Sequence, residues 1–371
     1  MHKLTVTAAQ FPGYELKRIT CHFFDPAYAS VLNVTPAEDG LSGSQTYILK
    51  HPETGRKYVL KQLPSDLSVD QIRWTQKLAD FARCNGHALL PVALDHCARS
   101  TQVSDAPSKI VSHSDGTMWQ CLVYIEGRPC KTPSTYHVSL AIEVLADFHQ
   151  KTSVFQMPPQ RTLSGWQRRV LQLQELLESR RSPLVNSINT TAVLAELHVL
   201  HKEFSRLICA VRTPQIIQHT LSYTMGNVHQ PTLRACRWNH VLFSDSSDCV
   251  TGMIDIDAAG WDDPAVDLSR LLGSWQLENQ ESEDVLFDLW PDAFRQYETS
   301  VAAGPDFPTR VQVLHDTAIL CGIHRWFTWI FAEKRYFPNM KEVLQRVTLL
   351  FHATPAAIRR LDRLPPRRDS N

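Results

Sequence analysis

A short pair of predicted strands, enclosed on both sides by helical sequence, constrains the fold of this chain more than any other feature. Residues 239–243 and 249–256 are apolar and rich in strand-forming side chains, and a polar turn at 244–248 joins them. A lone hairpin among helices gains little stability by itself, whereas active sites are often built on such segments. The sequence therefore indicates a functional site at this hairpin.

Two aspartates lie at the end of the second strand. In an extended chain Asp255 and Asp257 project from the same face, because side chains alternate along a strand. Paired carboxylates in such a place form the hard oxygen site that Mg²⁺ takes when it also binds substrate phosphates. A turn with solvated aspartates explains the pair alone equally well.

The rest of the chain predicts an α+β protein with two lobes. Hairpins are expected at 44–50 with 57–63 and at 110–113 with 118–125, and a helix at 69–83 that begins with a capping box of Ser68 and Gln71. From residue 133 onwards helical periodicity dominates, with helices at about 163–181, 190–212, 281–301, 308–335 and 339–352. We expect a small sheet lobe over residues 1–127, a helical lobe over 128–365 and a tail over 366–371.

Composition excludes several classes of partner. Lys plus Arg and Asp plus Glu are both 38, so no overall field attracts nucleic acid or an anionic membrane. The nine cysteines form no CxxC pair, which is typical of a reducing compartment. No apolar run is long enough for a signal peptide or a membrane span, so a cytoplasmic location is expected. The sequence identifies no protein partner.

The run from Val241 to Leu272 resembles the metal-binding segment of the aminoglycoside phosphotransferase and choline kinase-like family. That family has Asn-Val-Leu-Phe, a turn, Ile-Asp-Phe-Asp, and then Asp-Pro-Ala-x-Asp-Leu-Ala, and the order and spacing agree here. The resemblance implies a two-lobed protein kinase-like fold with a small antiparallel-sheet N-lobe and a larger helical C-lobe. It also implies phosphoryl transfer from ATP to the hydroxyl of a small molecule, with Asp255 holding Mg²⁺ on the phosphates.

The nucleotide side of the family pattern occurs in the same order, so the resemblance covers about residues 38 to 275. Residues 40–49 are similar to the loop that covers the nucleotide, and residues 120–129 are similar to the strand and hinge beside adenine. Residues 145–149 resemble the family helix that ends in histidine, so His149 is expected to be structural. The residues that the resemblance assigns to the nucleotide are Gly43, Ser44, Lys61 and the main chain of Tyr124 and Ile125.

The catalytic loop departs from the family pattern of His-Gly-Asp, four residues and Asn. Ala235 stands at the aspartate position and His240 at the asparagine position, with Leu233 and Arg234 before them. The lost carboxylate would orient the acceptor hydroxyl and take its proton. His240 is a second handicap, because Mg²⁺ prefers oxygen ligands, so at most one metal is expected.

These departures leave two functional interpretations open. The first is a phosphotransferase of impaired activity, in which Asp257 is the nearest carboxylate to replace the missing base. The second is a catalytically inactive pseudokinase that binds a nucleotide or ligand and acts as a regulatory protein. Arg237 either touches a phosphate or is a surface guanidinium. The helix after Lys61 has no obvious glutamate to pair with that lysine, and Asp70 and Gln71 are the nearest candidates.

The acceptor is an unidentified small molecule with a hydroxyl group. The acid-rich stretch Glu278–Asp292 lines a pocket for a cationic substrate in one interpretation and is a solvated helix face in the other.

Overall fold

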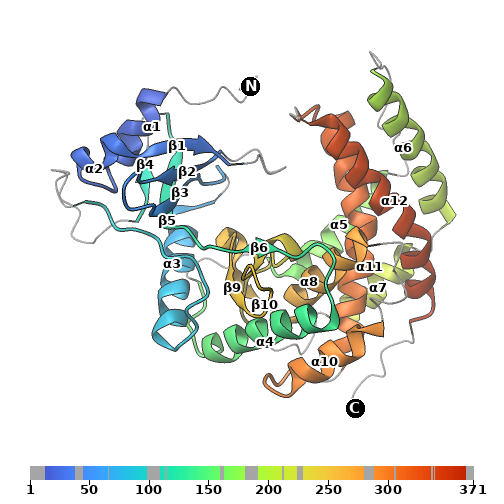
Figure 1. The fold of residues 1–371 in the computed structure, drawn as a ribbon. Helices are drawn as coiled ribbons and strands as arrows, with labels where there is room; N and C mark the ends of the chain where they lie inside the picture. Colours follow the sequence, from blue (N-terminus) through green and yellow to red (C-terminus); the bar gives the residue numbers. More distant parts are fainter. Residues whose placement is uncertain are drawn as a thin grey trace.

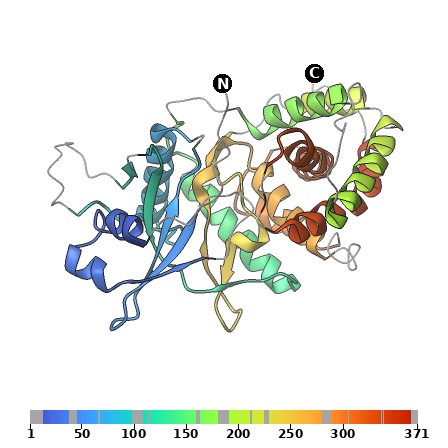
Figure 2. The ribbon, with the colours of Figure 1, turned by 90° about the horizontal axis from the view of Figure 1, so that it is seen from above.

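The fold has two lobes, a sheet lobe and a helical lobe, with the segment from about residue 230 to 279 lying between them in both views (Figures 1 and 2). The structure is a computed structural model of the 371-residue chain. It describes residues 13–37, 45–65, 67–97, 109–112, 115–158, 163–179, 191–210, 213–223, 229–279, 288–304, 306–335, 337 and 339–364. The expected tail at 366–371 therefore lies outside the described residues.

The sheet lobe contains a five-stranded antiparallel sheet in the order β1-β2-β3-β5-β4. Its strands are β1 (Asn33–Pro36), β2 (Thr46–Lys50), β3 (Lys57–Gln62), β4 (Val111–Ser112) and β5 (Met118–Val123). Both predicted hairpins are therefore confirmed. Alternating side chains of β2, β3 and β5 are buried, among them Leu49, Leu60 and Trp119. Lys61 follows Leu60 in the central strand, so its side chain points to the opposite face of the sheet.

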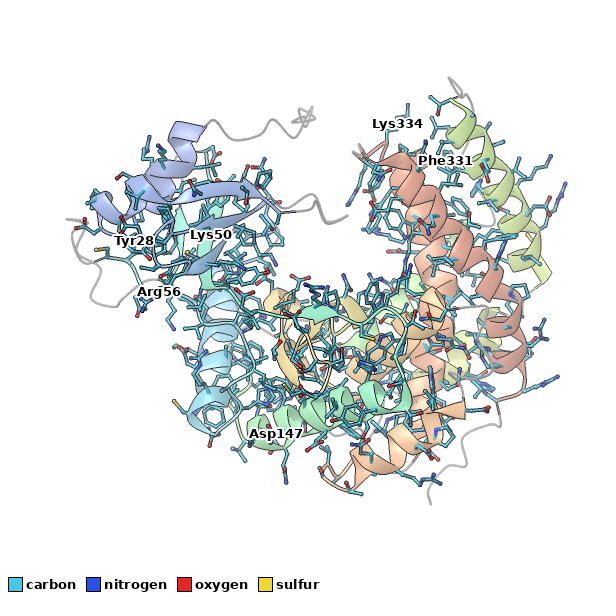
Figure 3. The ribbon with its side chains drawn as sticks, in the orientation of Figure 1. Tyr28, Lys50, Arg56, Asp147, Phe331 and Lys334 are labelled. Atoms are coloured by element: carbon cyan, nitrogen blue, oxygen red, sulfur yellow. The ribbon has the colours of Figure 1, made fainter. Side chains whose placement is uncertain are left out.

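Two helices that the sequence analysis did not predict cover the buried face of this sheet. They are α1 (Gly13–Thr20) and α2 (Pro26–Val31), and they supply Leu16, Ile19 and Ala29 to the same core as Leu49 and Trp119. They lie on the side of the sheet away from the helical lobe (Figure 1), and Tyr28 of α2 is near Arg56 on that side in Figure 3. The opposite face of the sheet is thus left to line the space between the lobes.

Helix α3 (Val69–Cys84) begins where the sequence predicts it. Ser68 Oγ accepts a hydrogen bond from the Gln71 backbone N–H at 3.2 Å, as an N-cap does. The predicted capping box is wrong in its second half, because the Gln71 side chain does not return to Ser68. Its Nε2 instead donates to the carbonyl oxygen of Ala259 at 2.7 Å. The side chain therefore fastens α3 to the segment that follows the two aspartates.

The embedded hairpin is shorter than predicted and joins a third strand. Strands β8 (Val241–Phe243) and β9 (Val250–Met253) pair with each other, and β6 (Arg128–Pro129) pairs with β8. Residues 238–240 form a turn of 3₁₀-helix instead of extending the strand. A second pair, β7 (Gln230–Thr232) with β10 (Gly260–Asp262), was not predicted. Each is three residues long, too short to give a periodic signal.

The expected extended conformation at the two aspartates is also wrong. Asp255 has the left-handed values φ 59° and ψ 52°, and a 3₁₀-helix (Ile256–Ala258) follows it. A left-handed residue is costly for any side chain with a Cβ and persists only where the surroundings impose it. The strand therefore ends before Asp255, and a tight turn, not strand alternation, sets the direction of both carboxylates.

The second lobe is helical, as predicted. Its helices are α4 (Thr135–Thr152), α5 (Gly165–Ser179), α6 (Ala192–Ala210), α7 (Thr213–Ser222), α8 (Ala265–Glu278), α10 (Trp290–Glu298), α11 (Phe307–Phe327) and α12 (Met340–Asp362). A π-helical turn, η4 (Thr328–Ala332), continues α11. Of the expected helix at 281–301, residues 281–287 lie outside the described residues, and α12 ends ten residues beyond its expected end. Within the described residues, no helix combines the length and apolarity that crossing a membrane requires.

Helix α8 packs closely against α11 because Gly273 has no side chain. A Cβ at Gly273 would lie 2.1 Å from Nδ1 of the buried His315. We expect Gly273→Ala to lower the free energy of unfolding by about 1–3 kcal/mol, the usual cost of overpacking a core. Urea denaturation measures this change.

The matched control is Gly322→Ala on α11, where the nearest atom to a new Cβ, Leu350 Cδ1, is 3.6 Å away. Alanine favours a helix interior over glycine by up to ~1 kcal/mol, so this variant should be as stable as the native chain or more so. Equal loss in both variants would contradict the packing argument.

Candidate functional site

A cavity of about 580 Å³ lies between the lobes. The sheet lobe contributes apolar side chains from β2, β3 and β5, and the segments at 120–129 and 239–257 form the other walls. This volume lies within the usual range for ligand pockets, which are mostly apolar with a few placed polar groups. Among its polar lining groups, Lys61, Asp255 and Asp257 form one charged cluster. The cavity therefore offers both apolar walls and a charged cluster to a ligand.

Lys61 lies between two carboxylates from the opposite lobe. Its Nζ is 2.5 Å from Asp255 Oδ1 and 2.6 Å from Asp257 Oδ2. Burial opposes the charge on Lys61, but the two carboxylates outweigh it and raise the pKa of the ammonium group. Burial likewise opposes the charge on Asp255, and Lys61 lowers the pKa of that carboxyl. Lys61 and Asp255 therefore form an ion pair between the two lobes.

Asp257, which the sequence analysis offered as a replacement for the missing base, contacts Lys61. Its Oδ1 accepts a hydrogen bond from Gln120 Nε2 at 3.1 Å, and its Oδ2 faces Lys61. Asp70 is exposed on α3, and the Gln71 side chain is engaged with Ala259, so neither of the two α3 candidates reaches Lys61. Asp257 is therefore directed towards the sheet lobe by Lys61 and Gln120. The sequence analysis missed Gln120, because one glutamine in a strand carries no signal.

A buried network positions the catalytic loop. Asp267 Oδ2 accepts the Leu233 backbone N–H at 2.7 Å and lies 3.0 Å from His149 Nε2, while His149 Nδ1 lies 2.7 Å from the Tyr297 hydroxyl. All of these side chains are shielded from solvent. Buried carboxylates are tolerated only where such partners exist. His149 therefore contributes to structure, holding the aspartate that fixes the start of the loop.

Arg234 stands where the family pattern has glycine, and its backbone adopts a conformation that favours glycine. Its φ is 59°, in the left-handed region where glycine is the ordinary residue. Its Nε donates to Asp262 Oδ2 at 2.9 Å, and its guanidinium covers Gly260, where a Cβ would lie 2.4 Å from Arg234 Cζ. This buried ion pair holds the strained residue in place.

Ala235 and His240 lie together at the centre of the loop. The Ala235 carbonyl oxygen is 2.7 Å from His240 Nδ1, and His240 Nε2 is 3.5 Å from Asp255 Oδ2. Burial lowers the pKa of His240, although Asp255 opposes the shift, so the ring is neutral at pH 7. A neutral ring that donates from Nδ1 leaves a lone pair on Nε2, directed to the Asp255 side.

These atoms test whether a divalent metal fits here. Asp255 is partly exposed to the cavity and offers a carboxylate oxygen, while His240 Nε2 offers one nitrogen. Among the described residues no group of three His, Cys, Asp or Glu side chains is placed to hold a metal. Mg²⁺ at phosphate sites is bound by one or two carboxylates together with the phosphates, so the residues fit one metal of that kind.

The remaining predicted site residues have mixed outcomes. Tyr124 and Ile125 line the cavity, but the Tyr124 backbone N–H donates to the Lys57 carbonyl oxygen at 3.2 Å and is thus engaged within the lobe. Arg237 is half-buried, and although burial lowers its pKa, Glu278 and Asp255 both oppose that shift. The structure therefore places it beside the site and not on an outer surface. Gly43 and Ser44 lie outside the described residues.

Comparisons with known proteins bear on the family and the fold of the chain. The model of the Phosphotransferase enzyme family matches residues 33–296. A comparison with curated protein sequences finds no match. Solved structures with similar folds include a spectinomycin phosphotransferase in complex with ADP and spectinomycin (TM-score 0.64, 9% identity, 96% of this chain and 100% of that chain covered).

Two further structures are similar over most of their length. One is an amicoumacin kinase in complex with AMP-PNP and Ca²⁺ (TM-score 0.57, 13% identity, 95% of this chain and 97% of that chain). The other is an ethanolamine kinase from Plasmodium vivax (TM-score 0.57, 9% identity, 93% and 89%). At these identities the likeness shows the fold, which is the two-lobed kinase-like fold that the sequence predicted.

The role of Asp267 in fixing the loop can be measured as stability. Asp267→Ala removes the acceptor of the Leu233 N–H and the partner of His149, and we expect a loss of ~3–5 kcal/mol, as for other broken buried pairs. Chemical denaturation followed by fluorescence reports this loss. The control Asp292→Ala removes an exposed aspartate that pairs with Arg295, and it should change stability by less than about 0.5 kcal/mol. A loss below about 1 kcal/mol for Asp267→Ala would contradict its anchoring role.

Proposed function

We propose that this chain, which belongs to the Phosphotransferase enzyme family, binds ATP with Mg²⁺ in the cavity between its lobes and transfers a phosphoryl group to a hydroxyl of a small molecule. This proposal rests on the observation that Lys61 contacts both Asp255 and Asp257 in that cavity. We further propose residues 1–127 as the nucleotide-binding lobe and 128–365 as the helical lobe. The loss of the catalytic-loop carboxylate at Ala235 would make the transfer slow.

Each cavity residue has a role in this proposal. The Lys61 ammonium would bind phosphate oxygens, which would compete with the carboxylates that it contacts in this structure. Asp255, with His240 Nε2 beside it, would hold Mg²⁺, which when bound neutralises charge on the transferred phosphate. The chain segment at Tyr124 and Ile125 would face adenine. Gly43 and Ser44 would cover the phosphates, as the family resemblance implies.

The rate argument depends on what replaces the missing base. General-base assistance is worth about 10²–10⁴ in rate, whereas most of phosphoryl transfer depends on positioning and charge. Asp257 is held by Lys61 and Gln120 on the side of the sheet lobe, which opposes its use as the substitute. Slow turnover without a carboxylate base is the result that this geometry supports.

The second candidate is an inactive pseudokinase that binds a nucleotide and acts as a regulatory protein. It is favoured by the contact in which His240 Nδ1 is tied to the Ala235 carbonyl oxygen, because this closes the loop around the two altered positions. Thermal stabilisation by nucleotide with no ATP consumption over sugars, aminoglycosides and amino alcohols would decide for this candidate.

Nucleotide binding tests the proposed role of Lys61. AMP-PNP should raise the melting temperature of the native chain, and more so with Mg²⁺ present. Lys61→Met should lose most of that shift, because no other charge lies between the two carboxylates. Each variant is compared with its own nucleotide-free melting temperature. The control is Lys57→Met, on the same strand as Lys61. It removes an ammonium group that pairs with Glu126, and it should keep the full shift. A full shift in Lys61→Met would overturn the proposed nucleotide site.

Restoring the family residues tests the cause of slow turnover. Ala235→Asp should raise ATP consumption by about 10²-fold or more, because it returns a general base. Adding His240→Asn should lower the Mg²⁺ concentration needed, since the amide oxygen is a better Mg²⁺ ligand than imidazole. Ala235→Asn, which has the same shape without the basic oxygen, is the control and should give no gain. Native turnover at ordinary kinase rates of about 1–100 s⁻¹ would contradict the proposed impairment.

A further inference from the structure

Four arginines from separate segments lie close together beside the catalytic loop on the side of the helical lobe. This arginine set comprises Arg169 of α5, Arg237 at the start of the 3₁₀-turn, Arg270 of α8 and Arg346 of α12. The other three members each interact electrostatically with Arg270, and their like charges disfavour the charged form of its guanidinium.

Helix α8 accounts for the placement of this set. Arg270, Ser274 and Glu278 recur at four-residue intervals and share one face of the helix. Ser274 Oγ accepts the Trp238 backbone N–H at 2.9 Å, which brings Arg237 and the loop to this face. Glu278 Oε1 accepts from Arg346 Nη1 at 2.9 Å, which brings α12 to the same face. Arg270 is therefore on the face of α8 that contacts both the catalytic loop and α12.

The charges of the arginine set are only partly balanced among the residues that the structure describes. Glu278 is shared by Arg346 and, at 3.5 Å, by Lys131. Arg169 is 7% exposed and donates to the neutral oxygens of Gln172 and Thr317, and its Nε has no described partner.

Arg270 is the least compensated member. Its side chain is open to solvent, and no hydrogen bond or ion pair links it to another described residue. Like charges held together without counter-charges destabilise a fold, so such an arrangement is typical of a site that is neutralised by a bound anion.

We propose that the acceptor of this phosphotransferase carries an anionic group, a carboxylate or a phosphate, which Arg270 binds together with Arg237 and Arg346. The inference rests on the proposed function, because it assigns this face to the acceptor. A guanidinium presents a planar fork of donors that matches both kinds of anion, and Glu278 holds Arg346 in a fixed orientation. Arg237 interacts electrostatically with both Glu278 of this face and Asp255, so the bound anion would be near the phosphate end of the cavity.

The cationic substrate that the acid-rich stretch suggested is not supported by the described part of that stretch. Glu278 is engaged with two cations, and Asp292 is exposed and paired with Arg295. Residues 280–287 lie outside the described residues. The face of α8 that contacts the catalytic loop through Ser274 carries Arg270 of the arginine set. Phe331 and Lys334, which lie at the far end of the helical lobe in Figure 3, are well removed from α8.

Equilibrium binding in the presence of AMP-PNP and Mg²⁺ tests the inference without turnover. The probes are four hydroxylated three-carbon compounds: glycerol, glycerate, glycerol 3-phosphate and 2-amino-1,3-propanediol. At least one anion should bind about tenfold more tightly than glycerol and the amine, with an affinity that falls as NaCl is added. Preference between glycerate and glycerol 3-phosphate distinguishes a carboxylate from a phosphate site. Equal affinity for all four, or no binding of either anion, would overturn the inference.

The variant Arg270→Gln tests whether the anion binds at this site. It should weaken the anion by about tenfold or more while leaving the melting shift with AMP-PNP intact. The control Arg206→Gln removes an exposed arginine of α6 that contacts Glu203, and it should bind as the native chain does. Unchanged anion affinity in Arg270→Gln would refute the site. If the anion binds but no ATP is consumed, the proposed transfer fails and the anion site stands. If AMP-PNP does not raise the melting temperature of the native chain, only the proposed nucleotide site is contradicted.

Discussion

The ion pairs that Lys61 makes across the lobes are the constraint on which the site depends. The partly buried Lys61 ammonium lies within 2.6 Å of an oxygen of each carboxylate, and burial by itself disfavours the charge on Lys61 and on Asp255. The pairing joins the central strand of the sheet lobe to the turn that carries Asp255 and Asp257. Phosphate oxygens would enter this cluster by replacing a carboxylate at Lys61, so binding of a nucleotide and the relation between the lobes are coupled.

The left-handed turn at Asp255 makes this geometry possible. Because the strand stops before it, both aspartates can turn to the same lysine, and Gln71 of α3 holds the chain just beyond them through Ala259. A second left-handed residue, Arg234, is fixed in the catalytic loop by Asp262. Backbone strain of this kind costs about 1–3 kcal/mol per residue and accumulates at functional sites. The buried network around Asp267 supplies the rigidity that keeps the loop in this strained form.

Much of the fold could be predicted from local signals. Alternating apolar residues in the sheet lobe and the Ser68 cap of α3 gave elements where the structure has them, and the motif order pointed to Asp255. The rest depends on contacts that have no local pattern. The use of Gln71 to bind Ala259 involves a partner 188 residues away, and the turn at Asp255 is imposed by tertiary contacts. The arginine set is drawn from four segments, and only the packing of α8 against the loop and α12 brings them together.

An anionic acceptor raises a physical difficulty that the position of Arg237 helps to resolve. Phosphoryl transfer would bring such an acceptor close to the phosphates of ATP, and two anions a few ångströms apart repel strongly where water is excluded. Arg237 interacts electrostatically with both Asp255 and Glu278, so it links the phosphate end of the cavity to the rest of the arginine set. A fixed guanidinium there attracts both anions at once and reduces their repulsion, which a neutral side chain would not do. The same charge is unnecessary for a cationic acceptor, which would itself attract the phosphates. The altered catalytic loop and the arginines on α8 and α12 can therefore be understood together, as a site in which positive charge positions the acceptor after the orienting carboxylate has been lost.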